Sequence, residues 1–352
     1  MEIPNFLKEL VEAASPSGHE FEAQRVIDRQ MASTAERYEK DVLGNRYARL
    51  NPEYPCQLLF MGHMDELGFA IHYIDEKGFL FFDRIGGHDL SIISGRHVRV
   101  LSREGPVPGV TGKRAVHLMD EEERKKVPKL HELWVDIGAK SDAEALKRVR
   151  IGDPIVYADT LESLGGELVS GRAFDDKAGA YAVMECLRRL TEERDSLDCG
   201  VTSVASVQEE VGVRGATTAA YRIHPRVGIA VDVGHATDFP GCEAKRDGKF
   251  SLGAGPLIAR GGNINPLVFE KLVACAEEKG IPYQIESETY PTGTDARAIQ
   301  MAQSGIATGL VSIPLRYMHT PVETLHLEDL ENVIRLLSAF AHSLRAEDRF
   351  EF

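Results

Sequence analysis

The sequence contains no apolar run near the roughly 20 residues that a membrane-spanning helix needs, and no block of basic residues interleaved with aromatics. Its 352 residues include 41 Lys and Arg against 55 Asp and Glu, a formal net charge of −14. An acidic chain without basic clusters argues against nucleic acid and anionic membranes as main partners. Apolar residues make up 43% of the chain, which is enough for a large core.

Cysteines are also few: five in total, scattered and never in a CxxC pair. An odd number of isolated cysteines is typical of reduced, buried thiols in a cytoplasmic protein. The first residues, MEIPNFLKELVEAAS, form an amphipathic helical pattern with acidic positions and do not indicate a signal peptide. We therefore expect a cytoplasmic protein.

The pattern of apolar, polar and turn residues changes along the chain and divides it into three parts. The pattern is helical up to about Tyr54, and QLLFMGH (residues 57–63) follows as an apolar strand typical of a sheet covered on both faces. Residues 67–159 contain short β-prone pieces between Gly, Pro and charged turns, with one helical insert near 141–149. After Gly171, helices and apolar strands alternate again, which implies a mostly parallel sheet.

These residue patterns predict an α/β fold with a mostly parallel central sheet flanked by helices. A small β-barrel or sandwich is expected to be inserted into it. The predicted boundaries assign residues 1–66 and 160–352 to the main domain and residues 67–159 to the inserted one.

Reactive side chains occur where the predicted strands end. Ligands of open α/β sheets bind beyond the carboxyl ends of the strands, so these side chains are expected to converge. The adjacent Asp175 and Asp176 stand where the next helix begins. The others are His63 and Asp65 after 57–63, Glu209 and Glu210 after 201–207, Asp232 within 227–233, and His319 after 308–314.

Each feature has an ordinary explanation when taken alone. Adjacent aspartates can cap a helix, Asp232 can be a hydrogen-bonded structural acid, and a lone histidine is more often a hydrogen-bonded residue than a ligand. Together, two histidines and three carboxylates match the imidazole and oxygen ligands of a pair of divalent cations. One aspartate of the pair is then expected to bridge metals about 3.5–4 Å apart, while the other supports the helix start.

The spacing within two motifs supports this interpretation. In an extended segment His63 and Asp65 point to the same side, so Asp65 can orient the imidazole from behind. Glu209 and Glu210 are adjacent and point in different directions. One can bind metal while the other acts as the general base toward an activated water.

The motifs resemble those of the M42 family of metallo-aminopeptidases, also called tetrahedral aminopeptidases, over essentially the whole chain. The similarity rests on SPSGHE, MGHMDELGF, GRAFDDKAG, SVQEEVGVRGA, VDVG, PTGTDA and YMHTPVE, in the family's order. It implies a cytoplasmic enzyme that hydrolyses N-terminal residues from short peptides with a free N-terminus. The implied assembly is a homo-oligomer in which dimers form a dodecamer through the inserted β-rich domain.

The resemblance also implies roles for individual residues. His63 and Asp232 would bind one metal, Glu210 and His319 the other, and Asp175 would bridge them. Two divalent ions, zinc, cobalt or manganese, would activate water and polarise the scissile carbonyl. Glu209 would be the general base and Asp65 would orient His63. The candidate substrate-binding residues are Arg260, Gly261, Gly262, Gly293, Thr294 and Asp295.

Other functions remain open at this point. A related metal-dependent amidohydrolase that removes N-acyl groups is the nearest alternative. A glycoside hydrolase using Glu209 and Asp175 is less favoured, because sugar sites use stacked aromatics and the chain has only Trp134. A non-catalytic shell protein is disfavoured by the complete ligand set. Lys177 stands where the family often has arginine, and His88, His97 and His117 are candidates for a further metal site or a pocket lining.

Overall fold

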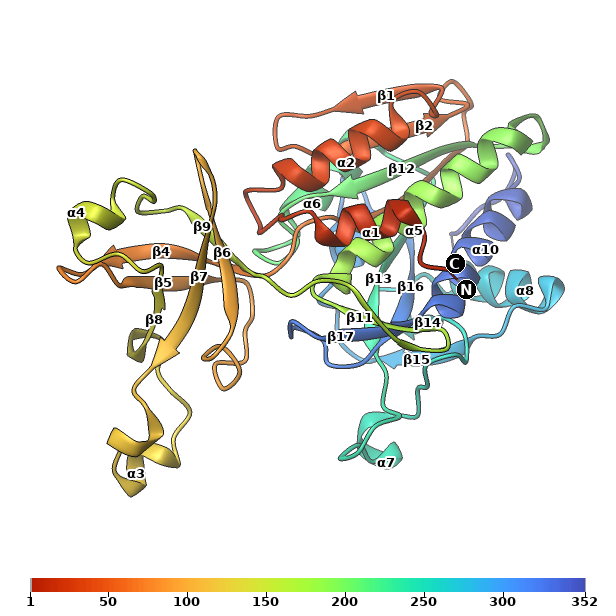
Figure 1. Ribbon diagram of the computed structural model, residues 1–352. Coiled ribbons are helices and arrows are strands. Elements are labelled where there is room, and N and C mark those ends of the chain that lie inside the picture. The colour runs from red at the N-terminus through yellow and green to blue at the C-terminus, as the bar shows by residue number, and fades with distance from the viewer. Residues whose placement is uncertain (1, 352) are drawn as a thin grey trace.

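The computed structural model describes residues 2–351, and its centre is a mixed sheet of eight strands (Figure 1). The four parallel pairs join β12 to β3, β3 to β13, β13 to β16, and β14 to β15. The predicted α/β class with a mostly parallel central sheet is therefore confirmed. In spatial order the strands are β1 (Arg37–Lys40), β2 (Arg46–Leu50), β12 (Gly200–Ser206), β3 (Gln57–His63), β13 (Val227–His235), β16 (Ala307–Leu315), β14 (Leu257–Gly261) and β15 (Gln284–Glu288).

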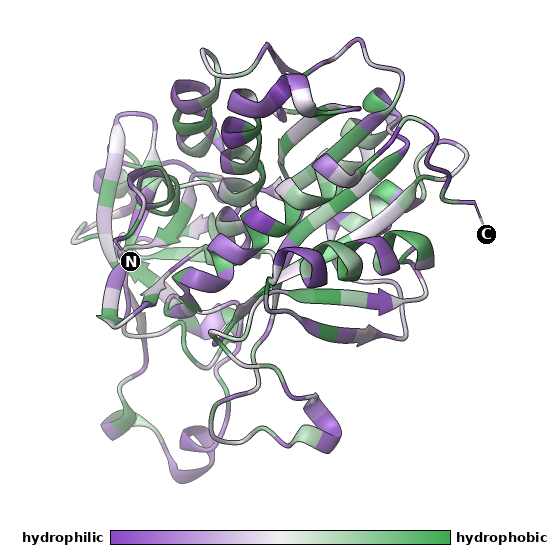
Figure 2. Ribbon diagram, turned by 90° about the vertical axis from the view of Figure 1, so that its right-hand side faces the viewer, coloured by the Kyte–Doolittle hydropathy of each residue, from purple (hydrophilic) through white to green (hydrophobic). Residues whose placement is uncertain are grey.

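Helices cover both faces of this sheet. The strands are largely apolar, and the helices turn polar sides outward (Figure 2), as expected for a sheet buried on both faces. One face carries α1 (Asn5–Glu12), α2 (Phe21–Met31), α5 (Phe174–Leu190), α8 (Pro266–Lys279) and α10 (Leu327–Ser343), and the other carries α6 (Arg214–Ile223) and α9 (Asp295–Gln300).

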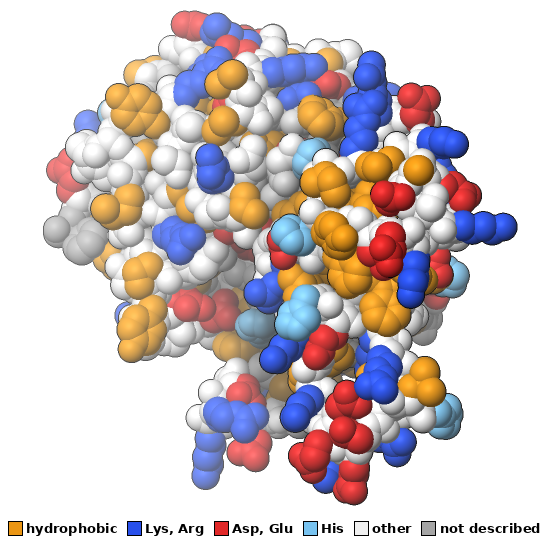
Figure 3. Space-filling model, turned by 90° about the vertical axis from the view of Figure 1, so that its left-hand side faces the viewer, with side chains coloured by type: hydrophobic (Ala, Val, Ile, Leu, Met, Phe, Trp, Pro, Cys, Tyr) orange, Lys and Arg blue, Asp and Glu red, His pale blue; other side chains and the backbone are white. Residues whose placement is uncertain are grey.

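The inserted segment forms a closed barrel of six strands with its own apolar core, at the left of Figure 1. Its strands are β4 (Gly68–Ile74), β5 (Leu80–Ile85), β8 (Leu133–Asp136), β7 (Gly105–Lys113), β6 (His97–Ser102) and β9 (Pro154–Tyr157). Between β7 and β8 the chain protrudes with η1 (Val116–Leu118), α3 (Glu121–Arg124) and η2 (Leu130–Glu132). Acidic and basic side chains lie side by side on this protrusion (Figure 3). The predicted helical insert appears as α4 (Asp142–Ala145).

A small sheet brings a distant loop to the start of α5. It consists of β10 (Glu162–Gly165), β11 (Leu168–Gly171) and β17 (Glu323–His326), in which Gly171 pairs with Glu323. The loop before β17 is thereby held against the segment that contains Asp175. The remaining short elements are η3 (Thr191–Ser196) and α7 (Ala244–Asp247).

The expectation of a helical pattern up to about Tyr54 is wrong for its last part, because β1 and β2 lie there. Tyr47 and Leu50 are buried in β2, which pairs with β12 and extends the sheet. Pairing with a distant strand therefore outweighs the local helical pattern in this stretch. All five cysteines are free, and four are buried, as expected. Among residues 2–351, no helix has the length and apolar character needed to cross a membrane.

Glycine at position 62 is required by the close approach of β3 and α5. A Cβ atom on Gly62 would lie 2.5 Å from the backbone carbon of Gly179 in α5. We predict that Gly62→Ala destabilises the protein by about 1–3 kcal/mol, since the helix must move away from the strand. Urea unfolding measures this change. Gly262→Ala is the matched control, because a Cβ there meets no atom within 4 Å, and equal stabilities of the two variants would contradict the packing argument.

Candidate active site

Six of the eight residues predicted to converge line one pocket of about 300 Å³ beside the carboxyl ends of the central strands, and Asp65 and Asp176 lie outside its lining. Each reaches it from a different element: His63 from the end of β3, Asp175 from the start of α5, and Asp232 from β13. Loops after β12 and β16 supply the others. The lining includes His63, Asp175, Glu209, Glu210, Asp232 and His319.

Asp175 lies between the two histidines. Its Oδ1 is 3.2 Å from Nε2 of His63, and its Oδ2 is 3.2 Å from Nε2 of His319. Nε2 of His319 is also 4.0 Å from Oε1 of Glu210. Burial alone would raise the pKa of Asp175, but the two imidazoles hold it below its usual range. One carboxylate thus presents a separate oxygen to each imidazole, as a bridging ligand must.

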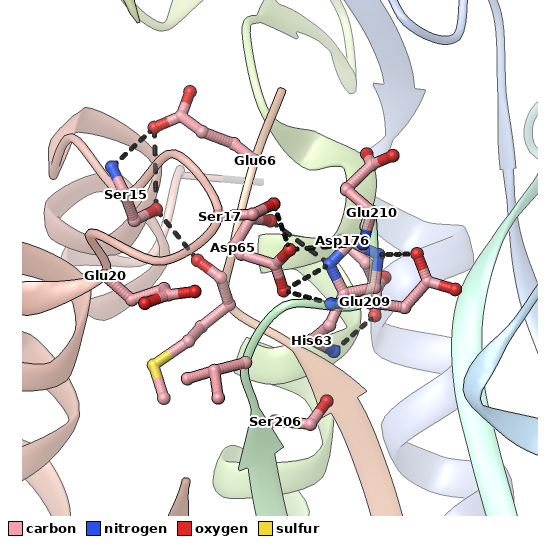
Figure 4. Close-up of polar contacts among 12 residues, drawn as sticks. Ser15, Ser17, Glu20, His63, Asp65, Glu66, Asp176, Ser206, Glu209 and Glu210 are labelled. Carbon is pink, nitrogen blue, oxygen red and sulfur yellow. Dashed lines mark hydrogen bonds and ion pairs between the residues drawn. The ribbon is translucent and has the colours of Figure 1, made fainter. Parts of the chain in front are cut away.

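Asp65 joins three segments of the site behind His63 (Figure 4). Nδ1 of His63 is 3.1 Å from the backbone oxygen of Asp65 and 3.4 Å from its Oδ1. The carboxylate also accepts hydrogen bonds from the backbone N–H groups of Glu209 (3.0 Å) and Glu210 (3.2 Å) and from the Ser17 hydroxyl (2.6 Å). Asp65 is fully buried, so this one side chain fixes both the imidazole and the diglutamate loop.

Two further carboxylates position ligands through the backbone. Asp176 accepts the N–H of His63 on Oδ2 (3.1 Å) and that of Gly179 on Oδ1 (3.0 Å), so it supports both β3 and the first regular turn of α5. Glu323 accepts the N–H groups of Asp175 (3.1 Å) and His319 (2.9 Å). Our sequence analysis did not identify Glu323, although it ends the motif YMHTPVE.

A buried ion network lies next to these groups. Glu66 pairs with Arg172 and, at 2.8 Å, with Nζ of Lys177, and it accepts the N–H of Ser15. Lys177 also donates to the backbone oxygen of Ala13, at 2.5 Å. Burial opposes ionisation, but Arg172 and Lys177 lower the pKa of Glu66 to about 2. This network connects the segment after α1 to the residues flanking the aspartate pair.

Three residues at the site that are not glycine have a left-handed backbone conformation. They are Ala173 (φ 62°), two residues before Asp175, Gln208 (φ 57°), directly before Glu209, and His319 itself (φ 62°). Such conformations are uncommon and persist where surrounding contacts enforce them. For His319 the hydrogen bond from its N–H to Glu323 is one such contact.

The pocket concentrates negative charge that protein cations do not balance. Burial and the charge of Asp232 raise the pKa of Glu209 to about 9, although His63 opposes the shift. Burial likewise raises the pKa of Asp232 to about 8. Within residues 2–351, Oε1 of Glu210 is buried without a hydrogen-bond partner. Divalent cations in the pocket would compensate the charge of all three groups.

The donor set fits such cations. Ligand atoms of His63, Asp175 and Glu210 lie within 4.8 Å of one another, and so do those of His63, Asp176 and Asp232. These are imidazole nitrogens and carboxylate oxygens without thiolates, which suits zinc, cobalt or manganese. The two groups share His63, so the coordinates present two adjacent candidate positions.

The candidate substrate-binding residues occupy different places. Gly293 and Thr294 line the pocket, and Asp295 is buried below it, where its Oδ2 accepts a hydrogen bond from Ser206 (2.6 Å). Arg260 lies over the ring of Phe269 at the end of β14. Gly261 pairs with Glu288 of β15, and Gly262 lines a separate cavity with Asn263 and Asn265.

The three additional histidines are dispersed. His88 stacks on Phe69 (4.3 Å between ring centroids), and its Nε2 lies 2.8 Å from the Gly68 backbone oxygen. Burial lowers the pKa of His88 to about 4. His97 begins β6 and is exposed, as is His117 on the protrusion. None of the three belongs to a candidate metal group within the described chain.

Comparison with known proteins identifies the family. The profile of the M42 glutamyl aminopeptidase family matches residues 44–336. The chain belongs to the M42 peptidase family. The predicted resemblance is confirmed, and the protein is an aminopeptidase, a hydrolase of peptide bonds.

Individual relatives cover almost the whole chain. It is 34% identical to a lysyl aminopeptidase of Pyrococcus furiosus, over 97% of both chains. Its structure is similar to a TET aminopeptidase from Thaumarchaeota archaeon SCGC AB-539-E09 (TM-score 0.93, 32% identity, 97% of this chain and 96% of that one). It is also similar to the TET1 peptidase of Pyrococcus horikoshii, described as assembling into a tetrahedron or a large octahedral shell (TM-score 0.86, 34% identity, 96% and 99% covered).

The buried Glu66 network predicts a defined pH dependence of stability. A carboxyl whose pKa falls from 4.5 to about 2 on folding stabilises the protein above pH 4.5, and this contribution is lost as the pH falls toward 2. Between pH 5 and 2, the unfolding free energy of the wild type should therefore fall by about 3 kcal/mol more than that of Glu66→Gln.

Urea unfolding at a series of pH values measures the difference. Glu53→Gln is the control, because Glu53 is largely exposed, and it should follow the wild type. Parallel curves for the wild type and Glu66→Gln would show that the network contributes no such dependence.

Proposed function

We propose that the protein is a metal-dependent aminopeptidase with two divalent ions held by His63, Asp175, Glu210, Asp232 and His319. The observation that carries the proposal is the position of Asp175, with one carboxylate oxygen 3.2 Å from each imidazole. Glu210 belongs to the candidate metal group with His63 and Asp175, and Asp232 to the one with His63 and Asp176, while His319 belongs to neither. The ions can be zinc, cobalt or manganese, which accept the same ligands.

When bound, the ions supply Lewis-acid activation of water and of the scissile carbonyl. Glu209 is the general base, since its Oε2 lies 3.9 Å from Nε2 of His63 at the pocket wall. It accepts the proton of the attacking water and returns it to the leaving amine. Asp65 positions both groups, through its contacts with His63 and with the backbone N–H of Glu209.

The substrates in this proposal are short peptides with a free N-terminus. A related deacylase would use the same centre on blocked amines and is the alternative. A glycoside hydrolase is not favoured, because Trp134 lies in β8 of the barrel, away from the catalytic pocket. Free and mostly buried cysteines support a cytoplasmic location.

We further propose a homo-oligomer built through the barrel, and the dodecamer as its complete form. The similar TET1 peptidase of Pyrococcus horikoshii, which can assemble into a tetrahedron or a large octahedral shell, supports this assembly. The barrel has a core separate from that of the main sheet, so it can serve contacts between subunits without altering the catalytic pocket. Light scattering that gives the mass of a single chain would contradict this part of the proposal.

Removal of the general base is the sharpest test of mechanism. We predict that Glu209→Gln lowers kcat for aminoacyl fluorogenic substrates by about 100- to 10,000-fold. Bound metal, measured by elemental analysis, should stay near the wild-type amount because the amide keeps the shape of the side chain. Turnover equal to that of the wild type would exclude Glu209 from this role.

Metal removal separates the candidate functions. Chelation should abolish hydrolysis of aminoacyl substrates, and added zinc, cobalt or manganese should restore it. A glycosidase with two carboxylates would keep its activity after chelation. The N-acetylated form of each substrate should be hydrolysed poorly, whereas faster hydrolysis of the blocked form would favour the deacylase.

A further inference from the structure

The catalytic pocket has a second wall that the proposed mechanism does not use. Glu286 and Glu288 of β15 line it together with Leu310, Ser312 and Met318. These residues lie next to the positions assigned to metal and general base. This wall therefore lies where the first side chain of a peptide can be accommodated.

Strand registers put the acidic wall on the same face as the metal centre. Asp232 is paired with Ser312, Ser312 with Leu257, and Leu257 with Gln284. Directly paired residues share a face and alternate residues return to it, so Glu286 and Glu288 face the same side as Asp232.

The distance along this face is short. A Cβ built on Gly234 would lie 3.6 Å from Oε2 of Glu286. Gly234 is two residues beyond Asp232 in β13, or about 7 Å along the strand. The Glu286 carboxylate is therefore about one extended side chain away from the metal centre.

The wall carries two carboxyl groups, and His235 acts on the charge of Glu288. Within residues 2–351, the side chains of Glu286 and Glu288 form no hydrogen bond or ion pair. Burial and the charge of Glu288 raise the pKa of Glu286 to about 7. Burial also raises the pKa of Glu288, although His235 opposes the shift. No Lys or Arg of the described chain lines the pocket.

The rest of the pocket lining adds apolar surface to the acidic wall. Glu210, which is assigned to the metal site, lines the same pocket. Leu310 and Met318 line the same pocket as Glu286 and Glu288. A long aliphatic stem with a cationic end matches such a surface.

We propose that Glu286 and Glu288 form the end of a side-chain subsite that selects peptides beginning with lysine or arginine. The proposal rests on the aminopeptidase function and deepens it. The same wall disfavours an N-terminal glutamate or aspartate, because like charges repel in a partly buried site. The inference therefore predicts a preference opposite to the glutamyl activity in the name of the M42 family.

The test compares kcat/KM for Lys, Arg, Leu and Glu aminoacyl fluorogenic substrates. The wild type should prefer Lys and Arg over Leu by at least about tenfold and should hydrolyse the Glu substrate least. Glu286→Gln should lower the Lys-to-Leu ratio by about 10- to 100-fold, as expected for loss of a charged contact. Glu286→Lys together with Glu288→Lys should reverse the order of the Lys and Glu substrates.

Glu278→Gln is the matched control, because Glu278 lies on α8 outside the pocket and pairs with Lys279. It should keep the wild-type ratio. An unchanged ratio in Glu286→Gln, or a wild-type preference for Leu or Glu, would overturn the subsite while leaving metal-dependent hydrolysis intact. Absence of hydrolysis for all four metal-loaded substrates would instead overturn the proposed function.

Discussion

Negative charge crowded into a buried pocket is the constraint on which the rest of the site depends. Asp175, Glu209 and Asp232 are each at least nine-tenths buried, and Glu210 adds a fourth carboxylate beside them. Such a group of like charges is unfavourable unless cations or hydrogen-bond donors compensate it. The protein supplies two histidines at the centre, and the remaining imbalance is the physical reason for assigning divalent ions there.

The fold holds these repelling groups in place mainly through backbone donors. Asp65, Asp176 and Glu323 each accept two main-chain N–H groups, and each thereby joins segments far apart in the sequence. The left-handed backbone at Gln208 and His319 shows that the loops are held away from their relaxed conformations. The candidate metal ligands are therefore positioned both by the strands that carry them and by the buried carboxylates that bind their backbone.

Much of this arrangement was predictable because its signals are local. Apolar strands such as 57–63 ending in His63 identified both the sheet and the edge where ligands meet. The side-by-side placement of His63 and Asp65 followed from the two-residue period of an extended chain. The strand β2 was not predicted, since its burial depends on pairing with the distant β12. Glu323 and Glu286 also escaped notice, because their roles depend on which segments the tertiary fold brings to the pocket.

One feature of the sheet has an evolutionary consequence. The catalytic ligands come from strands in the middle of the sheet and from the loops next to them, where a substitution would disturb neighbours on both sides. Glu286 and Glu288 instead belong to β15, which is the last strand and has a partner on one side only. Substitutions in β15 can therefore change which substrate side chain the pocket binds, with little loss of packing. Enzymes that descend from one ancestor can thus differ in substrate preference while keeping the same catalytic residues.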